Sequence, residues 1–326
     1  MEIPGVDIDR SLVQTEQSLL SRWGSYGKPK VSISCITYNH EHYISDALDG
    51  FLIQETDFPF EILVHDDAST DGTADIIRDY EKRYPRIIKP VYQKINQYSR
   101  NKRPSRFNYE RAQGDFIAVC EGDDYWIDSR KLSRQIGFLI DNPGFSLCFH
   151  DAVILYQDGK NQPLAFSSVN KKAPKKKFTI QDIILSPWFI PTASIVFRTC
   201  NLENPLWLNH IFTGDYALQL IQAAKGDLYG FDEIMSVYRM HSSNLYRQLN
   251  YSQIDVTHRT MDALLYFNMH TDFKYDSLIL KRLDNTRKEL YETLYEPLLN
   301  HRSPISKLLS IDYYRFKLRA LLGRDR

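Results

Sequence analysis

The sequence predicts an α/β protein whose central sheet is mostly parallel and carries helices on its faces. From residue 31 to about residue 156, short apolar runs typical of strands alternate with segments whose apolar residues recur at helical spacing. Two of the apolar runs end in clustered acids, and α/β proteins gather their ligands at the carboxyl ends of parallel strands. From about residue 252 the pattern is helical, so we expect a C-terminal helical extension.

The first half of the chain gives the most regular alternation. Strands are expected where apolar and β-branched runs are bounded by turn residues, at 31–38, 61–67, 87–93 and 115–122. Helices are expected where apolar residues recur every three or four positions, at about 44–52, 73–84 and 132–140. Strands joined in this way by helices pair in parallel.

The second half continues the sheet with one interruption. Residues 157–177 are polar and end in KKAPKKK, which indicates a mobile loop; its lysines favour a solvated face over a binding role. Further strands are expected at 145–156 and 193–199 and in segments up to Tyr238, with a helix starting near Gly214 and Asp215.

Composition excludes several classes of protein. Lys and Arg total 41, as do Asp and Glu, so no overall field attracts nucleic acid and we expect no nucleic-acid partner. The start MEIPGVDIDR has no basic region followed by an apolar stretch, and no run approaches the ~18 apolar residues of a membrane span. A cytoplasmic protein is therefore expected.

The four cysteines are widely spaced and lie in apolar, strand-like runs without Cys-x-x-Cys pairing. We interpret Cys35, Cys120, Cys148 and Cys200 as buried thiols in a reducing compartment, with neither a metal nor a disulfide role.

Acids cluster at the ends of two predicted strands. Asp66 and Asp67 follow EILVH, and Glu121, Asp123 and Asp124 follow FIAVC. Crowded carboxylates repel one another unless a cation neutralises them, and hard oxygen ligands suit Mg²⁺ or Mn²⁺. The alternative for either cluster is a solvated loop.

Three stretches in this order resemble the family 2 glycosyltransferases, which have the GT-A fold: ISCITYNHEHYISDALDGFLIQE, EILVHDDASTDGTADII and GDFIAVCEGDDYW. The second is similar to the family's V-D-D-x-S-x-D-G-T nucleotide-binding motif, and the third to its segment with the metal-binding acids. TGDYAL resembles the segment with the family's catalytic base, and VYRMHSSN resembles its Y-R-x-H motif. The resemblance covers about residues 30–245.

The resemblance implies roles for residues of the donor site. Thr37 and Tyr38 would border the nucleotide base, and one of Asp66 and Asp67 would accept a hydrogen bond from the base or ribose. Asp123 would contact the nucleotide diphosphate.

It also implies a metal site and a base. Asp124, Asp123 and His241 would hold Mg²⁺ or Mn²⁺, with nucleotide binding depending on the metal through Asp124, and Asp215 would be the catalytic base. Glu121-Gly-Asp123 also fits an acid-x-acid pattern, which leaves open whether Asp123 or Asp124 is the direct ligand. Many family members have Glu-Asp where this chain has Gly-Asp, so only one carboxylate is available for the base.

Structural alternatives exist for these residues. Asp215 stands where a helix cap is favoured, and His241 could be a surface histidine at a strand end. Tyr125 and Trp126 could line the donor sugar or close the core. Ser69 to Thr73 has the turn and cap chemistry to fix the loop that holds Asp66 and Asp67.

The resemblance implies an inverting glycosyltransferase of the hexosyl- or N-acetylhexosaminyl-transferase class. It would move a sugar from a nucleotide-diphosphate sugar, by preference a UDP-sugar, to a glycan or lipid-linked acceptor hydroxyl in cell-surface polysaccharide or glycoconjugate synthesis. One rival is a sugar-nucleotide nucleotidyltransferase, but the first strand is followed by TYNHEHY, which lacks the glycines of a phosphate-binding loop. A catalytically degenerate glycan- or partner-binding member is the other rival.

We expect three regions along the chain: an N-terminal extension at 1–29, the catalytic domain at 30–245 and a helical region at 246–326. The tail KLLSIDYYRFKLRALLGRDR mixes apolar and basic residues, which is compatible with peripheral contact to the inner face of an anionic membrane. A helix packed on the catalytic domain or on a second subunit is the alternative.

Overall fold

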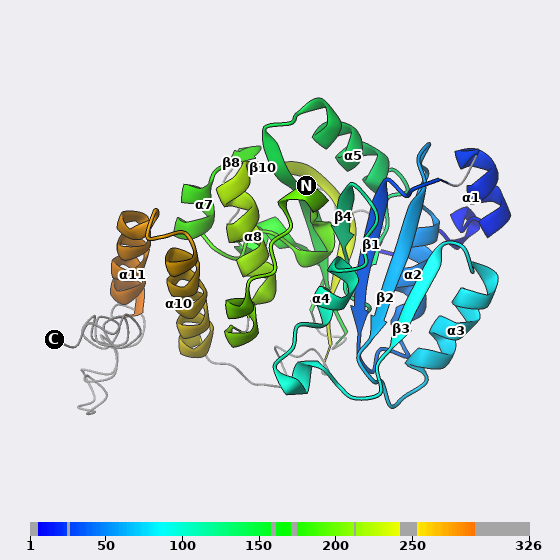
Figure 1. Cartoon of the computed structure of the whole chain (residues 1–326), viewed down its shortest axis with the longest axis horizontal. Helices are drawn as coiled ribbons and strands as arrows, with labels where there is room; N and C mark the ends of the chain where they lie inside the picture. Colours follow the sequence, from blue (N-terminus) through cyan, green and yellow to red (C-terminus); the bar gives the residue numbers. More distant parts are fainter. Residues whose placement is uncertain are drawn as a thin grey trace. The chain divides into compact units, whose positions relative to one another are not determined.

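The computed structural model (Figure 1) describes residues 6–24, 27–157, 161–170, 175–211, 213–241 and 253–290. The chain divides into two compact units, Met1–Asn250 and Tyr251–Arg326, and each is considered by itself.

The first unit is built on one mixed sheet in the order β3-β2-β1-β4-β9-β6-β10-β5, with β7 paired to β6 and β8 paired to β10. Its strands are β1 (Val31–Thr37), β2 (Phe60–Asp66), β3 (Ile88–Tyr92), β4 (Phe116–Val119), β5 (Tyr125–Trp126), β6 (Phe145–Tyr156), β7 (Leu164–Ala165), β8 (Lys177–Phe178), β9 (Val196–Arg198) and β10 (Asp227–Met240). The expected α/β class is confirmed.

Parallel pairing holds in the first half of the sheet, where β3, β2, β1 and β4 run in one direction. Beyond β4 the pairing is mixed, because β9 is antiparallel to both β4 and β6 and β5 is antiparallel to β10. The strand β10, which the sequence predicts as separate segments, is continuous but its register with β6 shifts at three bulges.

Helices cover both faces of the parallel half, with α2 and α4 on opposite sides of β1 and β2 in Figure 1. The α-helices of this unit are α1 (Glu16–Trp23), α2 (Ile44–Leu52), α3 (Thr73–Arg83), α4 (Pro104–Tyr109), α5 (Lys131–Asp141), α6 (Phe166–Asn170), α7 (Ile180–Leu185) and α8 (Gly214–Lys225). Short 3-10 turns lie at η1 (Arg10–Leu12), η2 (Tyr98–Arg100), η3 (Thr192–Ser194), η4 (Thr199–Asn201) and η5 (Leu206–His210).

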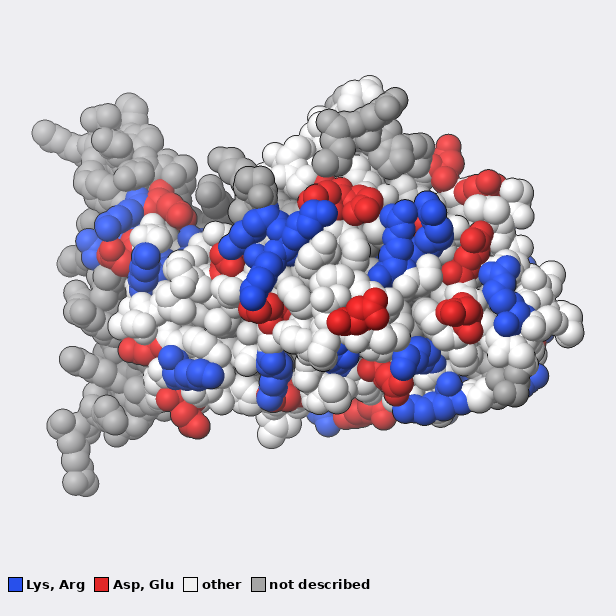
Figure 2. Space-filling model, turned by 90° about the horizontal axis from the view of Figure 1, so that it is seen from above, with Lys and Arg blue, Asp and Glu red and all other residues white. Residues whose placement is uncertain are grey.

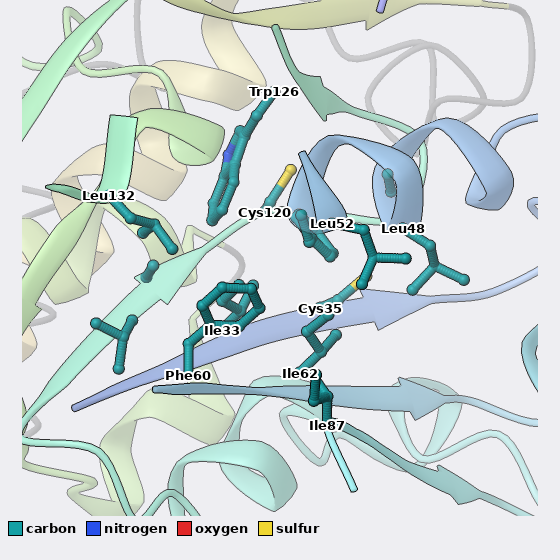
Figure 3. Close-up of a cluster of buried hydrophobic side chains, with 14 of the residues drawn as sticks. Ile33, Cys35, Leu48, Leu52, Phe60, Ile62, Ile87, Cys120, Trp126 and Leu132 are labelled. Atoms are coloured by element: carbon teal, nitrogen blue, oxygen red, sulfur yellow. The ribbon is translucent and has the colours of Figure 1, made fainter. Parts of the chain in front are cut away.

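The main core lies between the parallel strands and α2 (Figure 3). The apolar positions that predict α2 are all fully buried: Ile44, Ala47, Leu48, Phe51 and Leu52. Strands β1 and β2 are buried along almost their whole length, as expected for strands covered on both faces. The core therefore fixes the strands whose carboxyl ends carry the acids.

Three of the four cysteines are buried as expected, but the expectation for Cys200 is wrong. Cys35, Cys120 and Cys148 are buried free thiols. Cys200 is exposed because the strand β9 ends at Arg198 and the chain turns into the surface element η4.

The sequence predicts a mobile loop at 157–177, but the residues described in this range include β7, α6 and the start of β8. The lysines 175, 176 and 177 form ion pairs with Asp182, Asp232 and Asp227. These pairs favour the interpretation of this lysine run as a solvated surface. On the face shown in Figure 2, acidic and basic side chains are interspersed.

The second unit is helical where it is described, with α10 (Gln253–His270) and α11 (Asp276–Leu290) in contact. Phe267 stacks on Tyr275 with ring centroids 5.5 Å apart. The tail proposed to contact a membrane lies outside the described residues. None of the helices in the described part of the chain is long and apolar enough to cross a bilayer.

Candidate active site

The predicted site residues come from loops that follow β1, β2 and β4, from the end of β10 and from the start of α8. Thr37 of β1 is in register with Asp66 of β2, so these two strands end together at one edge of the sheet. A cluster at the carboxyl edge is where an α/β sheet can bind a ligand.

The loops after β1 and β2 are fastened to each other by hydrogen bonds. The backbone N–H groups of Asn39, His40 and Glu41 donate to Ser69 Oγ at 2.9 Å, Thr73 Oγ1 at 2.8 Å and Asp71 Oδ2 at 3.1 Å. In return, Asn39 Oδ1 accepts from the N–H of Thr70 at 2.8 Å and Glu41 Oε2 from that of Gly72 at 2.8 Å. The stretch from Ser69 to Thr73 therefore supports the site, as expected, and it also sets the position of His40.

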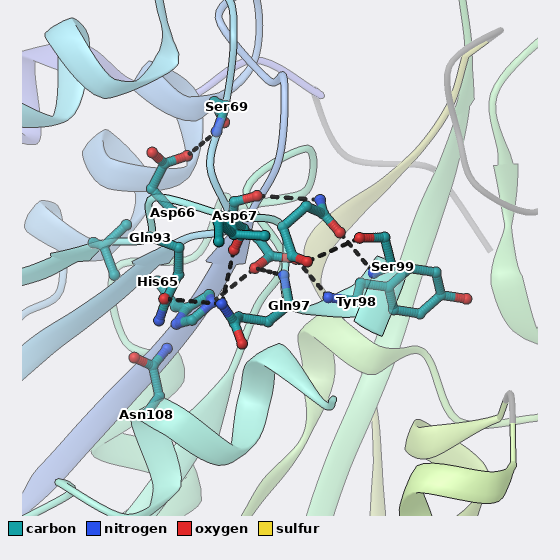
Figure 4. Close-up of polar contacts among 12 residues, drawn as sticks. His65, Asp66, Asp67, Ser69, Gln93, Gln97, Tyr98, Ser99 and Asn108 are labelled. Carbon is teal, nitrogen blue, oxygen red and sulfur yellow. Dashed lines mark hydrogen bonds and ion pairs between the residues drawn. The ribbon is translucent and has the colours of Figure 1, made fainter. Parts of the chain in front are cut away.

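Both carboxylate oxygens of Asp67 accept hydrogen bonds from other residues of the protein (Figure 4). Its Oδ1 accepts from the N–H of Gln97 at 2.7 Å and its Oδ2 from the N–H of Tyr98 at 3.0 Å, while His65 Nε2 lies 3.3 Å from Oδ1. Burial alone would raise the pKa of Asp67, but these hydrogen bonds hold it below its ordinary value. Asp67 thus anchors the loop before α4.

Asp66 is the more available carboxylate of the pair. Its Oδ1 accepts from the N–H of Ser69 at 3.3 Å, and the side chain of Ser69 also lowers the pKa of this carboxyl, so Ser69 is its hydrogen-bonding partner in the fold. Burial raises the pKa of Asp66. Of the two, Asp66 is the one with acceptor capacity left for a base or ribose.

Thr37 and Tyr38 differ in their exposure. The side chain of Tyr38 is 44% exposed beside the strand end, whereas Thr37 is buried and packs under the acidic loop. A Cβ at Gly122 would lie 2.7 Å from Thr37 Oγ1, so only glycine lets the loop pass this close. Thr37 Oγ1 has no partner among the described residues.

Asp123 faces two histidines. His241 Nε2 lies 3.1 Å from Asp123 Oδ2, and His40 Nε2 lies 3.7 Å from the same oxygen. Burial raises the pKa of Asp123, but His40 and His241 outweigh it and hold this pKa below its ordinary value. His241 is 3% exposed, which excludes the interpretation of this residue as a surface histidine.

Asp124 turns away from this cluster to the strand β10. Its Oδ1 accepts from the backbone N–H of Arg239 at 2.9 Å, and its Oδ2 is buried without a partner among the described residues. Burial, together with the charges of Asp123 and Glu121, raises the pKa of Asp124 well above its ordinary value. Burial likewise raises the pKa of Glu121 to about 8. Asp123 is the acid of this loop that keeps its charge.

Asp123 and His241 fit a divalent cation whose remaining ligands come from the phosphates of a bound nucleotide and from water. Two atoms at right angles around an octahedral ion, each about 2.1 Å from it, lie about 3.0 Å apart. Asp123 Oδ2 and His241 Nε2 lie 3.1 Å apart, which is close to this spacing but is also hydrogen-bonding distance, so a cation bound by both atoms would replace the hydrogen bond that His241 gives to Asp123. In the described residues no group of three or more His, Cys, Asp or Glu side chains could hold a metal alone. Mg²⁺ and Mn²⁺ sites that use one or two protein ligands are completed by substrate phosphates and water.

Asp215 lies in the first turn of α8 and is not its cap. The N-cap residue is Thr213, and no side-chain capping bond is made there. Thr192 Oγ1 lies 3.5 Å from Asp215 Oδ2, and burial raises the pKa of Asp215 above its ordinary value. The charge of Asp215 also raises the pKa of Glu121, which places the two acids in one electrostatic environment. Asp215 is thus not the N-cap residue, although hydrogen bonds from the backbone of Tyr216 and of Asp215 itself let its carboxylate stabilise the first turn of α8 as well.

Arg103 is a residue of this region that the sequence does not indicate. Its Nε donates to the carbonyl of Leu208 at 2.8 Å and its Nη2 donates to the carbonyl of Ile211. A Cβ at Gly214 would lie 2.4 Å from Arg103 Nη1, so the glycine at this position gives the guanidinium its space. The charge of Arg103 lowers the pKa of Asp215 against the effect of burial. A larger residue at this position would require the end of the Arg103 side chain to move.

Tyr125 and Trp126 close the core. Trp126 is fully buried, and its Nε1 donates to the carbonyl of Ala193 at 2.8 Å. Tyr125 is 4% exposed and lies beside the guanidinium of Arg239, 4.1 Å from the ring centroid. Neither side chain is available to line a donor sugar.

A half-parallel sheet, clustered acids at its carboxyl edge and a partly buried acid at the start of a late helix are the features of a GT-A fold. The sequence matches the family described as Glycosyl transferase family 2 over residues 32–201, about half of the chain. The chain belongs to this family.

Curated relatives extend the match. An uncharacterised protein of Mycobacterium tuberculosis is 35% identical over 220 residues, which is 66% of this chain and 60% of that protein. The glycosyltransferase TuaG of Bacillus subtilis, named for teichuronic acid biosynthesis, is 36% identical over 135 residues, 40% of this chain and 50% of TuaG. The matched region thus spans less than two thirds of these relatives.

Solved structures share the fold at low sequence identity. A fragment of Staphylococcus aureus TarS in complex with UDP-GlcNAc has a TM-score of 0.57 and 18% identity, covering 87% of this chain and 77% of that chain. The mannosyltransferase PcManGT of Pyrobaculum calidifontis, in complex with GDP-Man and Mn²⁺, has a TM-score of 0.52 and 13% identity, covering 99% and 92%.

Proposed function

We propose that this chain is a metal-dependent, inverting glycosyltransferase that moves a sugar from a nucleotide-diphosphate sugar to an acceptor hydroxyl. The observation that carries the proposal is the charged Asp123 facing His241 and His40 at the carboxyl edge of the sheet. Membership of the family supports the reaction class, and the donors and Mn²⁺ named in the complexes of TarS and PcManGT support the ligand class.

Asp123 and His241 are the residues that would hold Mg²⁺ or Mn²⁺. Asp123 is charged, and its oxygen and the His241 nitrogen have the spacing of two ligands of one ion. Asp124 remains a candidate for the direct ligand, because only its Oδ1 is bonded, to the N–H of Arg239, and its Oδ2 is buried without a partner among the described residues. When bound, the cation would offset charge on the diphosphate leaving group.

Asp215 acts as the general base. The acceptor hydroxyl loses its proton to the carboxylate as its oxygen forms a bond to the anomeric carbon, and the bond from that carbon to the diphosphate breaks. Burial raises the pKa of Asp215, so it accepts a proton more readily than an exposed aspartate does. One base and one displacement invert the anomeric configuration.

Donor and product are assigned by class. Asp66, with acceptor capacity left, and the exposed ring of Tyr38 would border a base such as uracil, and we favour a UDP-hexose or UDP-N-acetylhexosamine. The relative named for teichuronic acid biosynthesis supports a role in surface polysaccharide assembly, with a glycan or lipid-linked acceptor. The regions 1–29, 30–245 and 246–326 remain our proposal for the organisation of the chain.

The test compares Asp215→Asn with Asp123→Asn in the full chain. Asp215→Asn keeps the size of the side chain but removes the base, so transfer should fall by about 10²-fold or more while UDP binds with Mn²⁺ as before. Asp123→Asn removes the charged ligand and should weaken metal-dependent UDP binding itself. Transfer rates, UDP affinity by calorimetry and melting temperatures are measured for both variants. Near-normal transfer by Asp215→Asn, with an intact fold, would contradict the assignment of Asp215 as the general base.

A further inference from the structure

The N-terminal segment from Val6 to Trp23 lies outside the family match and yet is packed into the first unit. Most contacts of this segment attach it to residues of the first unit outside the acidic loop. Gln14 donates from its backbone N–H to the carbonyl of Leu52 at 3.3 Å and accepts from the hydroxyl of Tyr84 at 2.9 Å. Trp23 Nε1 donates to Thr56 Oγ1 at 3.1 Å. These partners lie away from the acidic loop.

Two other contacts of this segment lead toward the acidic loop. The carbonyl of Val6 accepts a hydrogen bond of 2.6 Å from the hydroxyl of Tyr125, which follows Asp124 directly in the chain. Arg10 forms ion pairs with Asp46 and Asp49 on α2, the second at 3.0 Å. Val6 and Arg10 thus contact residues near the acidic loop through two different neighbours, Tyr125 and Asp46.

Tyr125 and Asp46 both contact Arg239. Its guanidinium lies 4.1 Å from the ring centroid of Tyr125 and forms an ion pair with Asp46. Its Nη1 donates to the carbonyl of Asp123 at 2.8 Å, and its backbone N–H donates to Asp124 Oδ1 at 2.9 Å. The side chain of Arg239 is 5% exposed. A buried guanidinium with three partners, together with the backbone N–H bonded to Asp124, fixes the backbone on which Asp123 is carried.

We propose that residues 6–10 are a positioning element of the donor site, which holds Tyr125 and Asp46 against Arg239 and thereby sets the position of Asp123. This inference rests on the proposed function, because it gives the acidic loop its role toward the metal and diphosphate. Arg10 and Tyr125 are positioning residues, since they touch Asp46 and Arg239 and act on the ligand through them.

The chain offers a matched pair of variants to test this. Tyr125→Phe and Tyr84→Phe each remove one buried hydroxyl that donates to a carbonyl of the N-terminal segment. The two residues are 4% and 5% exposed, so both variants should lose similar stability. Tyr125 is next to Asp124 in the chain and lies against Arg239, whereas Tyr84 reaches this network only indirectly, by stacking on Tyr80, whose hydroxyl donates to Asp49.

We expect Tyr125→Phe to weaken UDP binding in the presence of Mn²⁺ by about fivefold, the size of one net hydrogen bond, and Tyr84→Phe to leave it within about twofold. With a donor sugar, Tyr125→Phe should raise KM for the donor and leave kcat at saturation unchanged, because the base is not affected. A purely structural role would lower the melting temperature of both variants and change the affinity of neither.

Arg10 gives a second test on a side chain that is 58% exposed, where folding is not at risk. Arg10→Met should weaken UDP binding with Mn²⁺ and Arg10→Lys should restore most of it. Lys28→Met is the control, because Lys28 is also N-terminal and exposed but pairs with Asp115. Equal affinities for Tyr125→Phe and Tyr84→Phe, or for Arg10→Met and the wild type, would overturn the inference.

Asp123→Asn is measured in the same series to separate this inference from the proposed function. If Asp123→Asn abolishes metal-dependent UDP binding and the N-terminal variants do not weaken it, the inference alone fails. If Asp123→Asn binds UDP with Mn²⁺ as the wild type does, the proposed metal site fails and the inference falls with it.

Discussion

Individual acids of the loop after β4 coexist because they do not share the same charge state. Burial and mutual repulsion raise the pKa of Glu121 to about 8 and that of Asp124 well above its ordinary value. The pKa of Asp123 is held below its ordinary value by His40 and by the hydrogen bond from His241; because burial lowers the pKa of His40 itself, the hydrogen bond from His241 is the firmer of the two causes. The cost of crowding carboxyl groups at a strand end is therefore reduced before any cation binds.

Lys131 is a second residue whose charge is decided by burial. Its side chain is fully buried, with Nζ 2.8 Å from Gln135 Oε1 and 3.9 Å from the ring centroid of Trp126. Burial lowers the pKa of Lys131 to about 7. The unfolded chain therefore binds this proton more tightly than the folded protein does.

We predict that Lys131 makes the free energy of unfolding rise with pH between about 7 and 10. Above the pKa of the folded state the lysine is neutral in the fold but still charged in the unfolded chain, so removing protons favours the fold. Lys131→Met keeps an unbranched apolar side chain and should flatten this rise. Urea unfolding at several pH values measures it, with Lys82→Met on the exposed side of α3 as the control. An unchanged slope for Lys131→Met would contradict the prediction.

At the scale of elements, the site depends on how two loops are fastened. Thr73 is fully buried at the start of α3, and its Oγ1 accepts from the N–H of His40. This bond holds the loop after β1 so that His40 lies near Asp123.

We predict that Thr73→Val destabilises the protein by about 1–3 kcal/mol, because it keeps the shape of the side chain and leaves the N–H of His40 without its acceptor. Metal-dependent UDP affinity should fall as well, since His40 is displaced. Thr70→Val is the matched control, because Thr70 is exposed and its hydroxyl lies 3.4 Å from Asn39 Oδ1. Equal unfolding free energies for the two variants would count against the role of Thr73.

Some of these elements and site residues can be predicted from local sequence patterns, and others cannot. The strands β1, β2 and β4 and the helices α2 and α3 are predictable because their apolar residues follow a local period, and the motifs locate Asp66, Asp123 and His241. The roles of Arg103 and Asp46 could not be predicted from the sequence, because their partners are remote along the chain. Arg103 bonds to Leu208, 105 residues away, and Asp46 bonds to Arg239, 193 residues away. The N-cap Arg103 and the short helix α4 that follows it leave no periodic signal either.

At the scale of the molecule, the proposed donor site draws on most of the first unit. Asp66 ends β2, Asp123 follows β4, Asp215 begins α8, and His241 follows β10. A ligand that bridges these elements ties together the two halves of the sheet, which are joined through the antiparallel strand β9. Binding should therefore stabilise the whole unit and not one loop.

We predict that UDP and Mn²⁺ together raise the melting temperature more than the sum of their separate effects. In the proposed site the protein would offer a metal two ligand atoms and the diphosphate would supply others, so each partner would complete the site of the other. At a ligand concentration of 100 times Kd the native state gains about 2.7 kcal/mol, a shift of roughly 5–11 °C for a unit of this size. Thermal unfolding with Mn²⁺, with UDP and with both measures the effect, and Asp123→Asn should abolish the cooperative part. A shift by Mn²⁺ alone as large as that by the pair would mean that the protein holds the metal without the diphosphate, and the two-ligand site would be wrong.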